Sequence, residues 1–215
     1  MTPSPSEHIF ADREDAARLL AERLHRYQND PDVVIYALPR GGVVMGRIIA
    51  DALHAPLDLI ITRKIGHPSF PEYAIGAVAE DGHLVANAPE ISSADQSWLN
   101  DEILSQRNEA KRRRAMYTKG LPAIDARHKT AIIVDDGIAT GLTMRCAIGE
   151  LKHRDPQKII VAVPVASPES IAIIKPLVDD IICINIPKHL GAIGEYYASF
   201  PQVEDAKVIN LMHLS

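Results

Sequence analysis

The chain has 215 residues, with 23 basic and 28 acidic side chains and a formal net charge of −5. This length fits one α/β domain with appendages, and the acidic balance argues against nucleic acid held by bulk charge. No apolar run approaches the roughly 18 residues of a membrane span. Residues Met1 to Glu7 are polar and lack the apolar stretch of a secretory signal, so we expect a cytoplasmic protein.

The N-terminal part predicts a helix followed by the start of an α/β alternation. Asp12 to Tyr27 has the spacing of an amphipathic helix, with Asp12 placed as its cap, and we treat residues 1–30 as an appendage of the main body. The nearly all-apolar run Val33 to Leu38 predicts a parallel strand that is covered on both faces. A helix from Val43 to Leu53 and a strand from Leu57 to Thr62 continue the alternation.

The next segment departs from this alternation. Arg63 to Glu72 contains two prolines and a glycine and is interpreted as a long loop. Two short apolar runs, Tyr73 to Ala79 and His83 to Asn87, flank Glu80-Asp81-Gly82, and an Asp-Gly turn between such runs predicts a β-hairpin. The sheet is therefore expected to be not purely parallel.

The second half of the chain predicts further helices and buried strands. Ser92 to Thr118 has the pattern of one long helix that ends before Gly120. Its basic run Lys111 to Arg114 spreads around the helix, so we interpret it as solvated surface rather than a nucleic-acid patch. The remaining predicted elements are a helix from Thr143 to Lys152, a strand from Lys158 to Val165, a helix from Pro168 to Leu177 and a strand from Asp180 to Ile186.

The most informative stretch follows the apolar run Ala131 to Val134. Asp135 and Asp136 come at its end, and a Gly/Ala/Thr turn then leads into a helix that begins near Thr143. The start of a helix offers unpaired N–H groups to a phosphate, and two carboxylates can accept hydrogen bonds from a vicinal diol. This arrangement predicts a sugar phosphate site. The alternative is an ordinary loop whose acids cap the helix.

A second turn of the same kind follows the first predicted strand. Gly41 and Gly42 permit backbone angles that turn consecutive N–H groups toward an anion, and Arg40 adds a positive charge. The alternative is a tight turn without a ligand. Because parallel strands end at one edge of a sheet, both turns are expected to face the same ligand, with phosphate at one end and pyrophosphate at the other.

Other motifs give little support to other chemistries. No pair of histidines has zinc spacing, and there is neither a Gly-Lys-Ser/Thr phosphate loop nor a Gly-x-Gly-x-x-Gly turn. Cys146 and Cys183 fall in a predicted helix and a predicted strand and are interpreted as core thiols. Trp98 is interpreted as a helix anchor.

The paired acids before a Thr-Gly turn resemble the 5-phosphoribosyl-1-pyrophosphate signature of type I phosphoribosyltransferases. Over nearly its whole length the chain also resembles a narrower bacterial group of phosphoribosyltransferase-like proteins of unsettled substrate. The resemblance implies an α/β fold with a doubly wound, mostly parallel sheet, a β-hairpin flap and a hood over the carboxyl edge, with residues 187–215 as the hood and C-terminal segment. The segments that carry it are Leu38–Val43, Arg63–Gly66, Pro71–Val78, Asp135–Thr143, Val163–Pro168 and Gly194–Tyr197 with Phe200.

The resemblance also implies roles for these residues. Asp135 and Asp136 would hold the ribose hydroxyls, and Arg40, Gly41 and Gly42 the pyrophosphate. The 5′-phosphate would lie on the turn made by Gly137, Ile138, Ala139, Thr140, Gly141 and Thr143.

In the implied flap, Arg63 and Lys64 would be the catalytic cations that meet the departing pyrophosphate as water is excluded. His67 is interpreted as structural or exposed. Mg²⁺ is the expected cofactor, carried mostly by the substrate. The function implied is transfer of the phosphoribosyl group to a nitrogen acceptor.

The acceptor stays open. Tyr196 and Tyr197 in the hood could stack a planar acceptor, or they could form a hydrophobic lid or a dimer contact. Ala139 stands where hypoxanthine-guanine enzymes place an Asp, which argues against a 6-oxopurine acceptor. By resemblance alone, a homodimer is expected.

Two other functions use the same pocket. A regulator could retain it as a nucleotide sensor, with Lys111 to Arg114 as the only local support and the cations Arg63 and Lys64 as an argument against it. A hydrolase that lets water attack the sugar pyrophosphate would differ only in flap closure.

Overall fold

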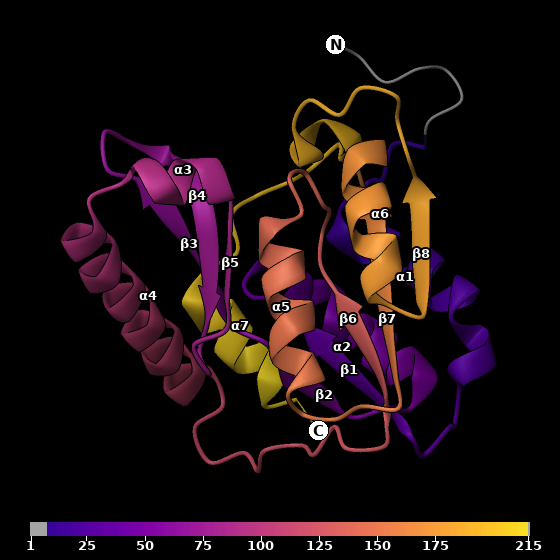
Figure 1. Ribbon diagram of the computed structural model, residues 1–215. Helices are drawn as coiled ribbons and strands as arrows, with labels where there is room; N and C mark the ends of the chain where they lie inside the picture. Colours follow the sequence, from indigo (N-terminus) through magenta and orange to yellow (C-terminus); the bar gives the residue numbers. More distant parts are fainter. Residues whose placement is uncertain (1–7, 215) are drawn as a thin grey trace.

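The computed structural model describes residues 8–214, so the interpretation of Met1 to Glu7 lies outside the described residues. Figure 1 shows a larger sheet with helices packed around it and a smaller sheet at its side. The strands are β1 Val33–Ala37, β2 Leu57–Leu59, β3 Thr62–His67, β4 Phe70–Ala79, β5 Leu84–Ala86, β6 Thr130–Val134, β7 Lys158–Val165 and β8 Asp180–Asn185. The helices are α1 Arg13–Arg23, α2 Gly41–Leu53, α3 Ala88–Ser93, α4 Gln96–Tyr117, α5 Leu142–Lys152, α6 Pro168–Ile174 and α7 Asp205–Met212, with 3₁₀ turns η1 His25–Tyr27, η2 Lys175–Leu177 and η3 Ile193–Tyr196.

The larger sheet has five strands in the order β2-β1-β6-β7-β8, and every pair in it is parallel. Alternate residues of each strand point to opposite faces. Val33 and Ile35 pack with α1 and α2, whereas Val34 and Tyr36 pack with α5 and α6. The sheet is therefore doubly wound, and all five β1 and all five β6 residues are buried, as their apolar sequences predict.

The smaller sheet has three antiparallel strands, β3, β4 and β5. Two predictions were wrong here. Arg63 to Glu72 is not a loop: most of it forms β3 and the start of β4, which turn at Pro68-Ser69. The hairpin also does not join the main sheet, which is purely parallel. The predicted strand Leu57 to Thr62 is divided between the two sheets, because Ile60 and Ile61 carry the chain from β2 into β3. The predicted turn at Glu80-Asp81-Gly82 is confirmed, and Gly82 adopts a positive φ of 102° there.

Two predicted helices end earlier or begin later than expected. The helix predicted over Ser92 to Thr118 is interrupted at Ala94, and α4 begins instead where the Asp95 carboxylate accepts the N–H of Trp98 at 2.8 Å. Helix α1 ends at Arg23, and the residues up to Tyr27 form a 3₁₀ turn. Asp12 caps α1 as predicted, by accepting the N–H groups of Glu14 and Asp15.

The N-terminal segment of the described chain meets the hood at the carboxyl edge of the sheet. Phe10 pairs with Tyr197, since the N–H of Phe10 donates to the carbonyl of Tyr196 at 2.9 Å and the N–H of Ala198 donates to the carbonyl of Phe10 at 2.8 Å. The N-terminal segment and the hood are thus held together. None of the helices in residues 8–214 is long and apolar enough to cross a membrane. Both cysteines are free thiols, Cys146 buried and Cys183 partly buried.

Candidate functional site

Two turns and one side chain of the hairpin meet in one cleft of about 260 Å³ at the carboxyl edge of the parallel sheet. One turn follows β1, another follows β6, and a side chain of β3 reaches in from the hairpin. The residues around the cleft are Pro39, Arg40, Gly41, Lys64, Asp135, Asp136, Gly137, Ile138, Ala139, Thr140, Gly141, Thr143, Met144 and Ile193. Asp135 and Arg40 therefore line the same cleft, as the two turns require if they bind one ligand.

The acid pair at the end of β6 is largely enclosed. Burial raises the pKa of Asp135 well above its ordinary value, and the neighbouring charge of Asp136 raises it further. Burial also raises the pKa of Asp136, against the effect of Arg13, whose Nε lies 2.9 Å from Asp136 Oδ2. The Asp136 N–H donates to Asp135 Oδ1 at 2.9 Å. These two acids are costly to ionise without a ligand that supplies donors.

The glycines of the first turn lie directly against the acids. A Cβ on Gly41 would lie 2.7 Å from Asp136 Cγ, and a Cβ on Gly42 would lie 2.7 Å from the carbonyl oxygen of Val134. Gly42 therefore packs behind Asp135 rather than lining the cleft. The Pro39-Arg40 peptide bond is cis. Close approach of the two turns explains why both positions after Arg40 are glycine.

The second turn is held at both ends by backbone pairing. Ile138 continues the parallel pairing with Ala166, and Gly141 enters α5 with a positive φ of 76°. The carbonyl of Ala139 accepts the hydroxyls of Ser167 at 3.1 Å and of Ser170 at 2.5 Å. Residues Gly137 to Thr143 thus form a fixed loop at the N-terminus of an 11-residue helix, where a phosphate is favoured.

Arg40 reaches away from the acid pair toward the C-terminal helix. Its Nη1 lies 3.6 Å from Asp205 Oδ1, and the same carboxylate oxygen accepts the hydroxyl of Tyr117 at 2.6 Å. Arg40 is partly exposed and lines the cleft, and its guanidinium is paired with Asp205 of α7.

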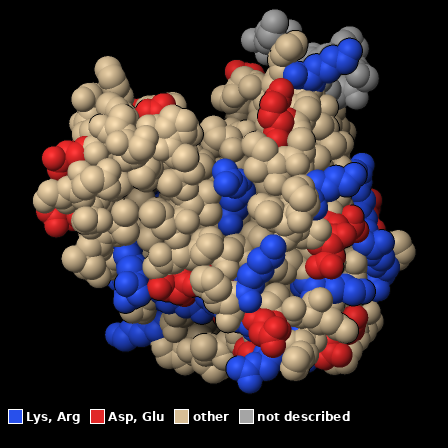
Figure 2. All heavy atoms as spheres, viewed as in Figure 1, with Lys and Arg blue, Asp and Glu red and all other residues tan. Residues whose placement is uncertain are grey.

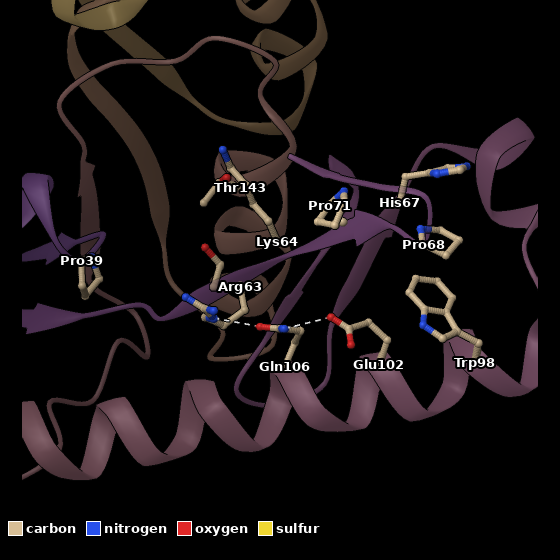
Figure 3. Close-up of a pocket in the computed structure, with 12 residues that line it drawn as sticks. Pro39, Arg63, Lys64, His67, Pro68, Pro71, Trp98, Glu102, Gln106 and Thr143 are labelled. Carbon is tan, nitrogen blue, oxygen red and sulfur yellow. Dashed lines mark hydrogen bonds between the residues drawn. The ribbon is translucent and has the colours of Figure 1, made fainter. Parts of the chain in front are cut away.

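The two predicted flap cations point in different directions. Lys64 is exposed and lines the cleft, where its charge acts on Asp135. Arg63 lies in a neighbouring chamber of about 630 Å³ between the hairpin and α4 (Figure 3). There its Nε donates to Gln106 Oε1 at 3.0 Å, and Gln106 in turn donates to Glu102 Oε1 at 2.9 Å. Burial, followed by the charge of Arg113, lowers the pKa of Arg63.

The chamber contains further residues from the hairpin and α4. His67 and Trp98 both line it. The ring centroids of His67 and Phe70 are 5.6 Å apart. Trp98 also packs on the small apolar cluster under the hairpin, in agreement with its interpretation as an anchor. The chamber shares Pro39, Lys64 and Thr143 with the cleft, so the two spaces adjoin.

The hood tyrosines do not line the cleft. Tyr196 and Tyr197 are 3% and 6% exposed, and the Tyr197 hydroxyl donates to the main-chain carbonyl of Asp136 at 2.7 Å. The stacking of an acceptor on these rings is therefore not supported by their position, because both rings pack into the core under the hood. Ile193 is the hood side chain that lines the cleft, and the sequence analysis missed it.

Arg13 was missed as well, although the sequence contains a signal for it. It occupies the buried face of α1 with Ala16, Ala17 and Leu20, at intervals of three, four and seven residues. A charged residue on an otherwise apolar helix face predicts a buried partner, and Asp136 is that partner.

The basic run of α4 is engaged by acids of the same molecule. Arg112 and Arg113 both bind Glu109, and Arg114 binds Asp58 at 2.8 Å. On the face seen in Figure 2, basic and acidic side chains are interspersed over the surface. This arrangement agrees with the expectation of no nucleic-acid patch, but only Lys111 and Arg112 are solvated surface, because Arg113 and Arg114 are partly buried against their acids.

Comparison with known proteins identifies the family. Residues 7–198 match the phosphoribosyl transferase domain. The crystal structure of TT1426 from Thermus thermophilus is similar with a TM-score of 0.79 and 37% identity, over 95% of this chain and 97% of that one. AQ2163 from Aquifex aeolicus is 13% identical with a TM-score of 0.52, over 85% of this chain and 78% of that one, and shares the fold alone.

A relative from Mycobacterium tuberculosis (strain ATCC 25618 / H37Rv), Rv0571c, is named as a candidate phosphoribosyl transferase. It is 36% identical over 203 residues, which are 94% of this chain and 46% of that protein. The chain thus spans about half the length of the curated relatives it matches. Since one family description covers most of the sequence and TT1426 resembles it nearly end to end, the chain belongs to the phosphoribosyl transferase domain family.

Proposed function

We propose that the protein is a phosphoribosyltransferase that uses 5-phosphoribosyl-1-pyrophosphate and Mg²⁺ to ribosylate a nitrogen acceptor. The observation that carries this proposal is the single cleft in which the acid pair, the loop before α5 and the Arg40-Gly41 turn meet. Asp135 and Asp136 would take the ribose hydroxyls, the loop from Gly137 to Thr143 the 5′-phosphate, and the Arg40 turn the pyrophosphate. Family membership supports the same activity.

The donor set fits a Mg²⁺ ion that arrives on the substrate. In residues 8–214 no group of three or more His, Cys, Asp and Glu side chains could hold a metal, and Arg13 already occupies one oxygen of Asp136. Mg²⁺ prefers oxygen ligands and keeps several waters, so phosphate and ribose oxygens would supply its ligands. Bound there, the ion would neutralise charge on the leaving pyrophosphate.

The order of the turns along the sheet edge supports one side of the sugar as the side from which the acceptor attacks. The hairpin follows β2, the Arg40 turn follows β1, the acid pair follows β6, and the hood follows β8, in the order of strands in the sheet. A nucleophile displaces a leaving group from its opposite side. Since the pyrophosphate would lie toward Arg40 and Lys64, the acceptor would enter from the hood side, next to Ile193.

An acceptor that enters from the hood side would meet an aliphatic surface next to the sugar. Ile193 presents an apolar surface there, and Ala139 offers no carboxylate to a ring proton. Both features favour a planar heterocycle other than a 6-oxopurine. The acceptor nitrogen would bond to the sugar C1 as the bond from C1 to the pyrophosphate oxygen breaks, and its proton would pass to solvent.

The direct test is pyrophosphate release. The full 215-residue chain is incubated with 5-phosphoribosyl-1-pyrophosphate, Mg²⁺ and a panel of nucleobases and related heterocyclic amines. We expect release with at least one acceptor, and its loss in an Asp135→Asn/Asp136→Asn double variant that stays folded. No release with every acceptor, together with no calorimetric binding of the sugar pyrophosphate, would contradict the proposal. Slow release without any acceptor would indicate the hydrolase instead.

A further inference from the structure

Arg13 is a buried cation at the start of α1, and it joins three parts of the molecule. It is 8% exposed. Its Nε donates to Asp136 Oδ2 at 2.9 Å, and its Nη1 donates to the carbonyl of Pro201 at 2.7 Å. The guanidinium also lies over the Phe200 ring, 3.7 Å from the centroid. The N-terminal helix, the hood and the acid pair therefore meet at one side chain.

Asp136 needs such a partner because of what surrounds it. Asp135 is its neighbour on the chain, and the Tyr197 hydroxyl is bound to its main-chain carbonyl rather than to its carboxylate. Lys64 and Arg40 line the same cleft, but the charge of Lys64 acts on Asp135, and Arg40 is paired with Asp205. Among residues 8–214, Arg13 is the cation that forms an ion pair with Asp136. A buried carboxylate beside another stays ionised only with such compensation.

Resting on the proposed function, we infer that Arg13 is a positioning residue for the sugar: it holds Asp136 charged and fixed so that Oδ1 can accept a ribose hydroxyl. Arg13 donates to Oδ2, and besides Arg13 the group within the described residues that hydrogen-bonds this carboxylate is the N–H of Asp136 itself, so Oδ1 keeps a lone pair for a ligand. Two of the three guanidinium nitrogens of Arg13 bind Asp136 and Pro201, and Arg13 is not among the residues that line the cleft. It therefore acts on the sugar through Asp136 and not by direct contact.

A double-mutant cycle tests this route. Binding of 5-phosphoribosyl-1-pyrophosphate with Mg²⁺ is measured by calorimetry for the wild type, Arg13→Met, Asp136→Asn and the double variant. We expect Arg13→Met to weaken binding about tenfold in the wild-type background and less than about twofold in the Asp136→Asn background. An equal loss in both backgrounds would overturn the inference, because Arg13 would then act on the ligand or on the fold directly.

The pH dependence separates a positioning role from a structural one. Without the guanidinium the pKa of Asp136 rises further, so its carboxyl group stays protonated over a wider pH range. In that range Oδ1 does not bind the ribose hydroxyl as a carboxylate oxygen would. The ratio of the Kd of Arg13→Met to that of the wild type should fall as the pH rises and should level off once Asp136 is ionised in both proteins. The ratio cancels the titration of the ligand itself. A ratio independent of pH would overturn the inference.

Two further variants control for folding. Phe200→Leu removes the ring under the guanidinium but leaves the ion pair, so its affinity for the sugar pyrophosphate should stay within about twofold of the wild type. Arg13→Lys keeps the charge but loses the planar fork that spans Asp136 and Pro201, so it should bind more weakly than the wild type and more tightly than Arg13→Met. A loss in Arg13→Lys as large as that in Arg13→Met would overturn the inference, since charge would then not be what matters.

The outcomes also separate this inference from the proposed function. Wild-type binding of the sugar pyrophosphate with an unchanged affinity in Arg13→Met would overturn the inference alone. No binding by the wild type would contradict the proposed function and overturn the inference with it.

Discussion

Gly41 and the carboxylate of Asp136 are in such close contact that no side chain fits between them. A Cβ on Gly41 would lie 2.7 Å from Asp136 Cγ, closer still to Oδ2, and 3.0 Å from Arg13 Nε. The turn after β1 and the acid pair after β6 are thereby one unit, although they lie far apart in the sequence.

Gly41→Ala should therefore reduce ligand affinity far more than stability. Gly41 is the first residue of α2 and has no positive φ, so the backbone accepts alanine and the carboxylate must move instead. We expect binding of 5-phosphoribosyl-1-pyrophosphate to weaken about ten- to a hundredfold, as for other small displacements of site groups. Calorimetry gives the affinity, and thermal unfolding gives the stability.

Gly46→Ala in the same helix is the matched control. Its Cβ would lie 2.7 Å from the Ala37 Cβ and 3.1 Å from Leu57 Cδ1, which is a core overlap away from the cleft. This variant should lose about 1–3 kcal/mol of stability but bind the ligand normally when folded. If the two variants exchanged these effects, the assignment of Gly41 to the site would be wrong.

The acid pair of the binding site is predicted to lower the stability of the folded protein at neutral pH. Burial and the charge of Asp136 raise the pKa of Asp135, so the folded protein becomes less stable as the pH rises from the ordinary Asp pKa through the raised one. Asp135→Asn removes this penalty and can still accept the N–H of Asp136. We expect a higher Tm at about pH 7.5, with weaker sugar binding, and a gain in Tm that disappears in acid.

Asp125→Asn is a fitting comparison, because Asp125 is exposed and also accepts a nearby backbone N–H, that of Arg127. Its Tm should change little at either pH. A gain in Tm in Asp125→Asn equal to that in Asp135→Asn would show that burial of the pair is not the cause.

Lys64 is expected to contribute to pyrophosphate binding from the hairpin. It is the flap cation that lines the cleft, whereas Arg63 is bonded to Gln106 in the neighbouring chamber. Lys64→Ala should weaken the binding of Mg²⁺-pyrophosphate about ten- to a hundredfold, which is typical of one lost hydrogen bond to a charged group. Lys111→Ala removes an exposed lysine of α4 and should leave the affinity unchanged. Equal affinities for the Lys64 variant and the wild type would contradict this role.

The parallel core could be predicted from sequence because its strands are short apolar runs between clear turn residues. Val33–Ala37 and Thr130–Val134 are buried throughout, and the turns that follow them carry the binding residues in unbroken stretches. The pairing of β3 with the start of β4 was missed from the residues because Pro68 and Pro71 look like loop residues. In the structure one proline lies at the tip and the other lies at the irregular end of the β3–β4 pairing.

The parts of the site that were missed come from distant elements. Arg13, Ile193 and Ser170 reach the cleft or its supporting loop only after α1, the hood and α6 dock onto the sheet edge. No local pattern encodes that docking for Ile193 or Ser170. For the hood tyrosines, residue type left two interpretations open, and their burial fits the hydrophobic lid rather than a stacking surface for the acceptor.

Glu150 gives the last prediction, a pH effect on stability far from the cleft. It is 1% exposed, its Oε2 has no hydrogen-bond partner within residues 8–214, and its other oxygen binds Arg154. Burial raises its pKa from 4.5 to about 7, against the opposing charge of Arg154. The folded protein holds this proton more tightly than the unfolded chain, so stability falls as the pH rises from 4.5 to about 7.

Glu150→Gln cannot ionise, so its stability relative to the wild type should increase across this window by about 1–3 kcal/mol. Denaturant unfolding at a series of pH values gives the difference. Glu109→Gln should respond in the opposite direction, because Arg112 and Arg113 lower the pKa of Glu109 to about 2. Its stability relative to the wild type should fall as the pH rises through about 4.5 and then level off. A difference between Glu150→Gln and the wild type that stayed constant from about pH 4.5 to 7.5 would show that Glu150 titrates normally.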